Sequence, residues 1–337
     1  MGLSDTSALI LAISLQLISA SVNYIGMTIQ KKAATEMPKI GKETGLGKSF
    51  KNMITNKAWL LGFLLNSSST FLAAGSFALA SITIMQPLYG FGLIVLVIFI
   101  HFYLKEKITR LDIVGVIFGI VGIITIGVTA KPIPKMTYTE LLDKFLGSEY
   151  RGVIFFAVIL SIALITYFVS DRTKKNISLV FLVISSAIWT STQNIFNKAV
   201  ATSVRHGGFV EAFFGEGWLY TWTFVLLFIL VSVIGIIMLN IAYQDGHGVI
   251  ILPIWTAIQV VVPVLSGVII FEEWSSAYYS PTEKGIQSLG MIIMLTSIVI
   301  LSISSGKKED FRKLVTQPKT SNDIENQQIE DNEISNS

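Results

Sequence analysis

Uncharged polar side chains interrupt several long apolar stretches of the sequence, and these are the residues with which the chain could do chemistry. Trp189, Gln193 and Asn197 follow one another at intervals of four, so on a helix they stack on one face. Asn23 and Tyr24 interrupt an apolar stretch near the N-terminus in the same way. Further residues of this kind are Asn66, Thr70, Gln86, Asn240 and Gln259. Together these groups predict a polar cavity near the middle of an apolar bundle, or else interhelical hydrogen bonds worth about 0.6 kcal/mol each.

A second group of residues lies near the ends of the apolar stretches. It comprises Pro87, Glu106, Asp245, Pro253 and Glu272. The two glutamates suit either gates of a pathway or bonds to a neighbouring helix start or loop base. The two prolines suit a helix start or a kink, because proline lacks an N–H. Asp245 suits an inner gate or a turn beside Gly246. Charges inside the apolar stretches are otherwise expected to be nearly absent.

The elements that position these residues follow from the length of the apolar stretches. A bilayer core about 30 Å thick needs ~20 apolar residues in a helix, and backbone groups in lipid must bond within the protein. The chain is therefore expected to be an all-α polytopic membrane protein with nine transmembrane helices. The nine stretches are 8–30, 58–80, 84–104, 112–130, 152–169, 178–200, 219–243, 249–271 and 286–304.

Composition supports the same class of protein. Of the 337 residues, 52% are hydrophobic and 14% charged, against roughly 25% charged in ordinary globular domains. The chain has no cysteine, which excludes disulfides and thiolate metal sites. A net charge of +3 does not point to a nucleic-acid partner. Phosphate-binding, zinc-protease and serine-hydrolase motifs are absent, so we expect neither an enzyme nor a cofactor.

The sequence also repeats itself at an offset of 166 residues. This offset pairs Pro87 with Pro253 and Glu106 with Glu272, and it pairs Lys32 with Lys198. Matched proline, glutamate and lysine residues arise by chance less readily than matches between Leu, Ile and Val.

The repeat predicts the topology. Residues of about 8–130 form one repeat of four helices, residues 178–304 the second, and the helix 152–169 links them. Five helices separate equivalent positions, so the second repeat is inverted in the membrane. Inverted repeats are common in secondary transporters, which bind their substrate near the midplane between the repeats. The expected mechanism is alternating access.

The basic residues predict the orientation. With the N-terminus outside, 18 of the 25 basic residues fall in inside loops and in the tail, as the positive-inside rule requires. Residues 1–305 are then the transmembrane domain, and 306–337 a polar, disordered cytoplasmic tail. The plasma membrane is the default location and the lipid bilayer the expected partner. The sequence leaves the oligomeric state open, a homodimer included.

Several stretches resemble a known family. They are LISASVNYIGMTIQKKA, PLYGFGLIVLVIFIHFYLKEKITRLDIVG with the glycine-spaced GVIFGIVGIITIG, LNIAYQDG, and FEEW. These stretches resemble the drug/metabolite transporter superfamily, which includes the EamA-like permeases. Within it they are most similar to the NIPA-type magnesium transporters, over about residues 8–305. The resemblance implies nine spans, an outside N-terminus and a secondary transporter whose leading substrate is magnesium or another divalent cation.

The sequence departs from that branch at a few positions. Where the branch has a glutamate and an asparagine in the second helix, this chain has Thr70 and Ala73. It keeps the asparagine of the seventh helix as Asn240 and has Ile241 where the branch has lysine. The polar residues alone suit a small polar metabolite equally well, exported or exchanged. The ligands of any metal are not identified by the sequence.

Overall fold

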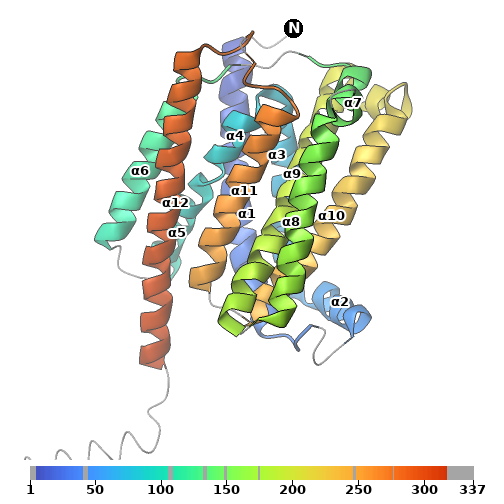
Figure 1. Ribbon diagram of the computed structural model, residues 1–337. Coiled ribbons are helices and arrows are strands. Elements are labelled where there is room, and N and C mark those ends of the chain that lie inside the picture. The colour runs from blue at the N-terminus through green and yellow to red at the C-terminus, as the bar shows by residue number, and fades with distance from the viewer. Residues whose placement is uncertain are drawn as a thin grey trace, which may run out of the picture.

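The protein is a bundle of helices (Figure 1). The computed structural model describes residues 5–40, 45–104, 109–131, 135–147, 150–173, 175–245, 248–275 and 277–316. The helices are α1 (Asp5–Thr35), α2 (Leu46–Thr55), α3 (Lys57–Leu79), α4 (Ile82–Leu88), α5 (Phe91–Leu104), α6 (Arg110–Gly127), α7 (Tyr138–Leu146), α8 (Arg151–Arg172), α9 (Lys175–Phe214), α10 (Trp218–Asp245), α11 (Gly248–Ile269) and α12 (Pro281–Thr316). Below, the upper end is the one at which α1 begins and α7 lies in Figure 1, and the lower end is the one with α2.

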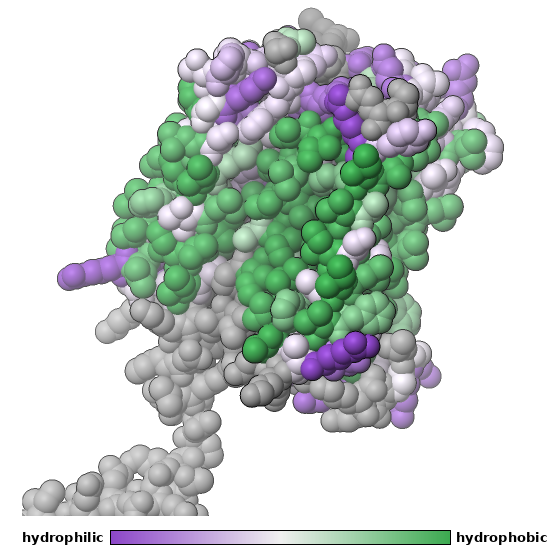
Figure 2. Space-filling view, in the orientation of Figure 1, coloured by the Kyte–Doolittle hydropathy of each residue, from purple (hydrophilic) through white to green (hydrophobic). Residues whose placement is uncertain are grey.

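Seven of the described helices are long and apolar enough to cross a membrane, namely α1, α3, α6, α8, α9, α10 and α12. The other two predicted stretches correspond to shorter apolar helices, Ile82–Ile98 and Ile254–Ile269. On the face that Figure 2 shows, a broad apolar band crosses the bundle, with hydrophilic residues gathered above it and others at the lower right below it. The prediction of an all-α protein with several spans is confirmed, while nine spanning helices and the inverted repeat stay predictions.

The predicted stretch 84–104 is interrupted after Leu88, so it contains the end of α4 and the whole of α5. Tyr89 N donates to Gln86 O at 3.0 Å and Gly90 N donates to Pro87 O at 3.1 Å, before α5 begins. Pro87 lies in the last turn of α4, where it cannot donate a helical hydrogen bond to the Thr83 carbonyl. A second break separates α3 from α4, since Ala80 has an extended backbone, with φ −141° and ψ 170°. Both breaks place backbone polar groups inside the bundle.

Other predicted boundaries also shift. Most of the segment 201–217, between the sixth and seventh predicted stretches, is helical, because α9 runs on to Phe214 across a kink at Gly208, where φ is 82°. The helix α7 lies between the fourth and fifth predicted stretches. α12 continues to Thr316, beyond residue 306, and the domain boundary there stays a prediction. Its end contains Lys307, Lys308, Arg312 and Lys313, and lysine and arginine are good helix formers. Residues 317–337 lie outside the described residues.

Two glycines bring α1 and α3 into close contact. The helices α1 and α3 pack along each other, as do α9 with α10 and α6 with α12. A Cβ atom added to Gly62 would lie 2.6 Å from the carbonyl oxygen of Gly26, and one added to Gly26 would lie 2.8 Å from that of Gly62. Small residues let helix backbones approach in this way in membranes.

Adding a single methyl group at this contact is therefore expected to destabilise the bundle. Gly62→Ala should cost about 1–3 kcal/mol, since the added carbon overpacks a backbone contact. The matched control is Gly285→Ala, because a Cβ there meets no atom within 4 Å. Thermal unfolding in detergent measures both, and equal unfolding temperatures for the two variants would contradict the prediction.

Candidate functional site

A chain of polar contacts links α1, α3 and α11 through the turn after α4. The Tyr24 hydroxyl on α1 lies 2.8 Å from the Thr256 hydroxyl on α11. The Tyr89 hydroxyl donates to Asn23 Oδ1, and Asn23 Nδ2 donates to Ser69 Oγ on α3 at 3.1 Å. The predicted pair Asn23 and Tyr24 therefore connects three different elements rather than facing lipid.

A second set of contacts centres on Gln259 of α11, which is 2% exposed. Its Oε1 accepts from Asn194 Nδ2 of α9 at 2.9 Å, and its Nε2 donates to the Thr190 hydroxyl. Its backbone carbonyl accepts from Gln86 Nε2 of α4 at 2.7 Å. The predicted residues Gln86 and Gln259 are thus brought together, and they join α4 and α9 to α11.

Aromatic rings connect these two sets of contacts, which together we call the central network. The ring centroids of Tyr24 and Tyr89 lie 5.5 Å apart, and those of Tyr89 and Trp255 lie 6.5 Å apart. Two buried polar atoms here have no hydrogen-bond partner among the described residues, namely Gln86 Oε1 and Trp255 Nε1. Buried polar groups are normally paired, so these atoms are free to bind water or a solute.

The helix α3 is bonded to its neighbours α1 and α9 through three of the predicted residues, Asn66, Thr70 and Asn197. Asn66 Nδ2 donates to Gln30 Oε1 of α1, and Asn197 Nδ2 of α9 donates to the Thr70 carbonyl at 3.1 Å. The Thr70 hydroxyl donates to the Asn66 carbonyl of its own helix at 3.1 Å. These residues tie α1 and α9 to α3.

The predicted polar face of α9, which includes Trp189 and Gln193, makes few of the contacts in the central network. Trp189 and Gln193 are half-buried, and Trp189 packs against the apolar core. Asn194, the neighbour of Gln193, makes the contact to Gln259 instead. The residues of α9 that contact Gln259 are Thr190 and Asn194, so the face towards α11 is the one next to the predicted face.

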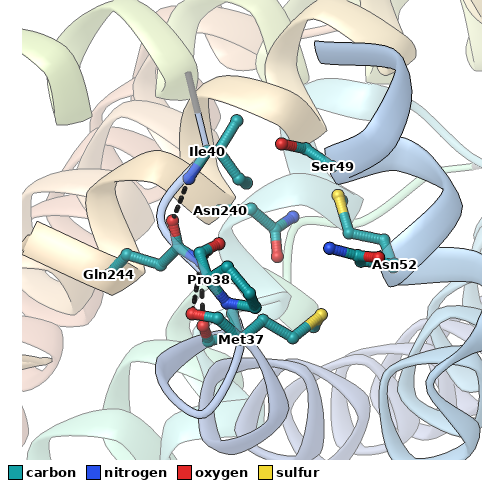
Figure 3. A pocket seen from close by; sticks show the side chains of 9 residues that line it. Met37, Pro38, Ile40, Ser49, Asn52, Asn240 and Gln244 are labelled. Carbon is teal, nitrogen blue, oxygen red and sulfur yellow. Dashed lines mark hydrogen bonds between the residues drawn. The ribbon is translucent and has the colours of Figure 1, made fainter. Parts of the chain in front are cut away.

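Asn240 lies at the lower end, away from the central network. Its Oδ1 accepts from Trp59 Nε1 at 2.9 Å. It lines a small cavity between the end of α1, α2 and α10 (Figure 3), with about 10 Å³ accessible to a water-sized sphere. Gln244 closes one side of this cavity, where it donates to the Ala34 carbonyl at 3.0 Å and accepts from Ile40 N at 2.9 Å. A cavity of this size holds about one water molecule.

Of the residues predicted as gates or structural groups, the structure describes the side-chain contacts of Glu272. Glu272 at the upper end forms ion pairs with Lys144 of α7 and Arg151 of α8. Asp245 is the last residue of α10 and Pro253 lies within α11, but their side chains lie outside the described residues. Glu106 lies outside them altogether.

The ion pairs of Glu272 should make stability depend on pH. The bond from the Lys144 ammonium, helped by Arg151, holds the pKa of the Glu272 carboxyl below its usual value of 4.5. Because this pKa is lower in the folded protein, the ion pairs contribute fully to stability above the pKa of the unfolded chain. Their contribution is lost as pH falls below about 4.5. Glu272→Gln should therefore show a smaller fall in unfolding temperature than the parent between pH 6 and pH 3. Parallel curves for the two proteins would contradict this.

The sequence did not reveal Lys198 and Glu273. Their side chains are 2% and 5% exposed, and Lys198 Nζ lies 3.4 Å from Glu273 Oε1. The expectation that charges inside the apolar stretches are nearly absent is therefore wrong for Lys198, which lies in the middle of α9. Its place within the stretch 178–200 was the available signal, because buried charges in membrane helices are costly and usually functional.

Comparison with known proteins identifies the family. The model of the family Magnesium transporter NIPA matches residues 5–307. The chain belongs to this family. Its membership confirms the resemblance to NIPA-type transporters and to the drug/metabolite transporter superfamily.

Three relatives from Arabidopsis thaliana show how far the similarity extends. The chain is 25% identical to "Probable magnesium transporter NIPA9" over 87% of its own length and 82% of the relative. It is 25% identical to "Probable magnesium transporter NIPA6" over 84% of each chain, and 24% identical to "Probable magnesium transporter NIPA1" over 89% of its length and 87% of the relative. No solved structure matches the chain significantly. Family membership and seven candidate spans support an integral, multi-pass membrane cation transporter.

Proposed function

We propose that the protein carries Mg²⁺ or another divalent cation across the membrane by alternating access. The observation that carries the proposal is that the chain matches the NIPA magnesium transporter family over residues 5–307. The central network supplies the second argument, because it offers neutral oxygen donors inside an apolar bundle.

The chemistry of this network suits a cation that keeps its water. Mg²⁺ prefers six oxygen ligands and loses water reluctantly. Among the described residues, no group of three or more His, Asp or Glu side chains could hold a bare metal ion. Hydroxyl and amide groups such as those of Tyr24, Gln86 and Gln259 would instead bind the hydration shell. Binding through water is weak enough to permit release on the other side.

Alternating access is supported by contacts between the proposed repeats. α1 packs along α3, and α9 packs along α10, which are equivalent pairs at the offset of 166 residues. Several contacts cross from one proposed repeat to the other, among them those of Tyr24 with Thr256, of Gln86 with the Gln259 carbonyl, and of Asn197 with the Thr70 carbonyl. In this mechanism such contacts break and re-form as the bundle opens on either side. The positive-inside rule would place the lower end in the cytoplasm, where α2 carries Lys48 and Lys51.

Uptake into liposomes tests the proposal. Purified protein is reconstituted with a magnesium-sensitive dye inside, and uptake is followed with an imposed inside-negative potential. Saturable uptake above that of protein-free liposomes is expected. Asn197→Leu should abolish uptake, because it removes the α9–α3 contact while keeping the helix apolar. Folded protein that takes up no Mg²⁺ would overturn the choice of substrate, and unchanged uptake by the variant would overturn the role of Asn197.

A small polar metabolite is the second candidate substrate. The rings of Tyr24, Tyr89 and Trp255, with the unpaired Trp255 Nε1 and Gln86 Oε1, offer stacking surface and hydrogen bonds to an organic solute. Thr70 also stands where NIPA-type transporters carry a glutamate. Saturable exchange of a labelled amine or amino acid, from protein that carries no Mg²⁺, would favour this candidate.

A further inference from the structure

The break between α3 and α4 encloses a positive charge. Lys198 Nζ donates to the carbonyl oxygens of Phe77 at 2.7 Å and Ala80 at 2.9 Å, and it lies 3.4 Å from Glu273 Oε1. The Lys198 residue is 1% exposed. Three oxygens from two separate segments therefore surround one ammonium group, away from the central network.

The two carbonyls are available because α3 ends here. The last four carbonyls of a helix have no partner within it, and the C-terminal end of a helix carries a partial negative charge. Phe77 lies in the last turn of α3, and Ala80 follows it with an extended backbone. Both oxygens are thus directed into the break by the backbone, whatever side chain stands at position 198.

The carboxylate is also held in place without the lysine. Glu273 Oε1 accepts from Ile82 N at 3.0 Å, and Oε2 accepts from Thr83 N at 2.9 Å and from the Thr83 hydroxyl at 2.6 Å. A Cβ atom added to Gly267 would lie 2.8 Å from Oε2, so backbone packs closely behind the acid. Removing Lys198 would leave this carboxylate buried in its present position.

We propose that the oxygens of Phe77, Ala80 and Glu273 form a cation site whose resident cation is the Lys198 ammonium, and that a small metal ion occupies it when the lysine is removed. Carboxylate and carbonyl oxygens are the ligands of Na⁺, Mg²⁺ and Ca²⁺ in proteins, and carbonyls at interrupted helices coordinate ions in membrane transporters. In the native protein the lysine closes the break without an ion from solution. This inference does not depend on which substrate the protein carries.

Removal of the lysine tests the site through stability rather than transport. Lys198→Ala is purified in choline chloride, and thermal unfolding is followed as NaCl, KCl or MgCl₂ replaces it at constant ionic strength. We expect a lower unfolding temperature than the parent in choline, and a saturable rise of about 5 °C or more with one of the metal ions. The parent protein should show no such rise. The arms with Na⁺, K⁺ and Mg²⁺ identify the ion that fits.

Matched variants make the result specific. Lys32→Ala removes an exposed lysine at the position equivalent to Lys198, and should show no ion-dependent rise. The double variant Lys198→Ala/Glu273→Gln lacks the carboxylate and should not be stabilised by any ion. Lys198→Ala that is folded yet insensitive to all three ions would overturn the site, as would an equal rise in Lys32→Ala. If the alanine variant does not fold, Lys198→Ser is measured in the same way and judged by the same outcomes.

Discussion

Gln259→Leu is expected to reduce transport at least about tenfold while the protein still inserts and folds. Leucine is close to glutamine in size, but it cannot accept from Asn194 or donate to Thr190, so both partners lose a hydrogen bond made inside the bundle. Leaving buried polar groups unpaired costs about 1–3 kcal/mol, and the loss falls on the residues that join α9 to α11. Initial uptake rates in liposomes, at matched protein content, measure the effect.

Gln287→Leu is the matched control for this experiment. Gln287 is a fully buried glutamine on α12, and its Nε2 lies 3.5 Å from the Thr129 carbonyl, outside the central network. Its replacement should lower stability more than transport. If the two leucine variants transport equally well, the central network is structural and the pathway lies elsewhere.

Glu273→Ala is expected to have the largest effect on stability of any single change considered for this chain. The substitution leaves the Lys198 ammonium without its carboxylate and frees the N–H groups of Ile82 and Thr83. Removing one partner of a buried ion pair costs about 3–5 kcal/mol. Thermal unfolding in detergent, or the yield of monodisperse protein, would report the loss.

The neighbouring residue provides the control for Glu273. Glu272 also forms ion pairs, but its side chain is 37% exposed, and exposed pairs are worth less than about 1 kcal/mol. Glu272→Ala should therefore be much milder than Glu273→Ala at neutral pH. Equal destabilisation by the two alanine variants would show that the buried pair with Lys198 contributes no more to stability than the exposed pairs of Glu272.

The helices were largely predictable because bilayer thickness fixes their length. Each predicted apolar stretch corresponds to described helical residues, and the errors occur where local chemistry interrupts a helix. Pro87 and Gly90 were visible in the sequence, but whether such residues kink a helix or end it depends on the packing around them. Similarly, the extended backbone at Ala80 has no signal in an alanine.

The candidate site was predictable only in part. Asn23, Tyr24, Gln86 and Gln259 were identified because amides and a tyrosine are uncommon in apolar helices. Their partners Ser69, Thr190 and Thr256 were not, since Ser and Thr on helices commonly bond to their own backbone. For Glu273 the reason is geometric. Glu272 has a left-handed backbone with φ 50°, and the turn it makes sends two adjacent glutamates to different surroundings.

The length of α12 has a consequence for how the protein meets the aqueous phase. Its 36 residues span about 54 Å at 1.5 Å per residue, whereas a bilayer with its headgroups is about 40–45 Å thick. The helix begins at the upper end, so its last turns project beyond the lipid on the other side. α12 also packs along α6. These projecting turns therefore continue a helix that is packed, within the apolar part of the bundle, against a second candidate span.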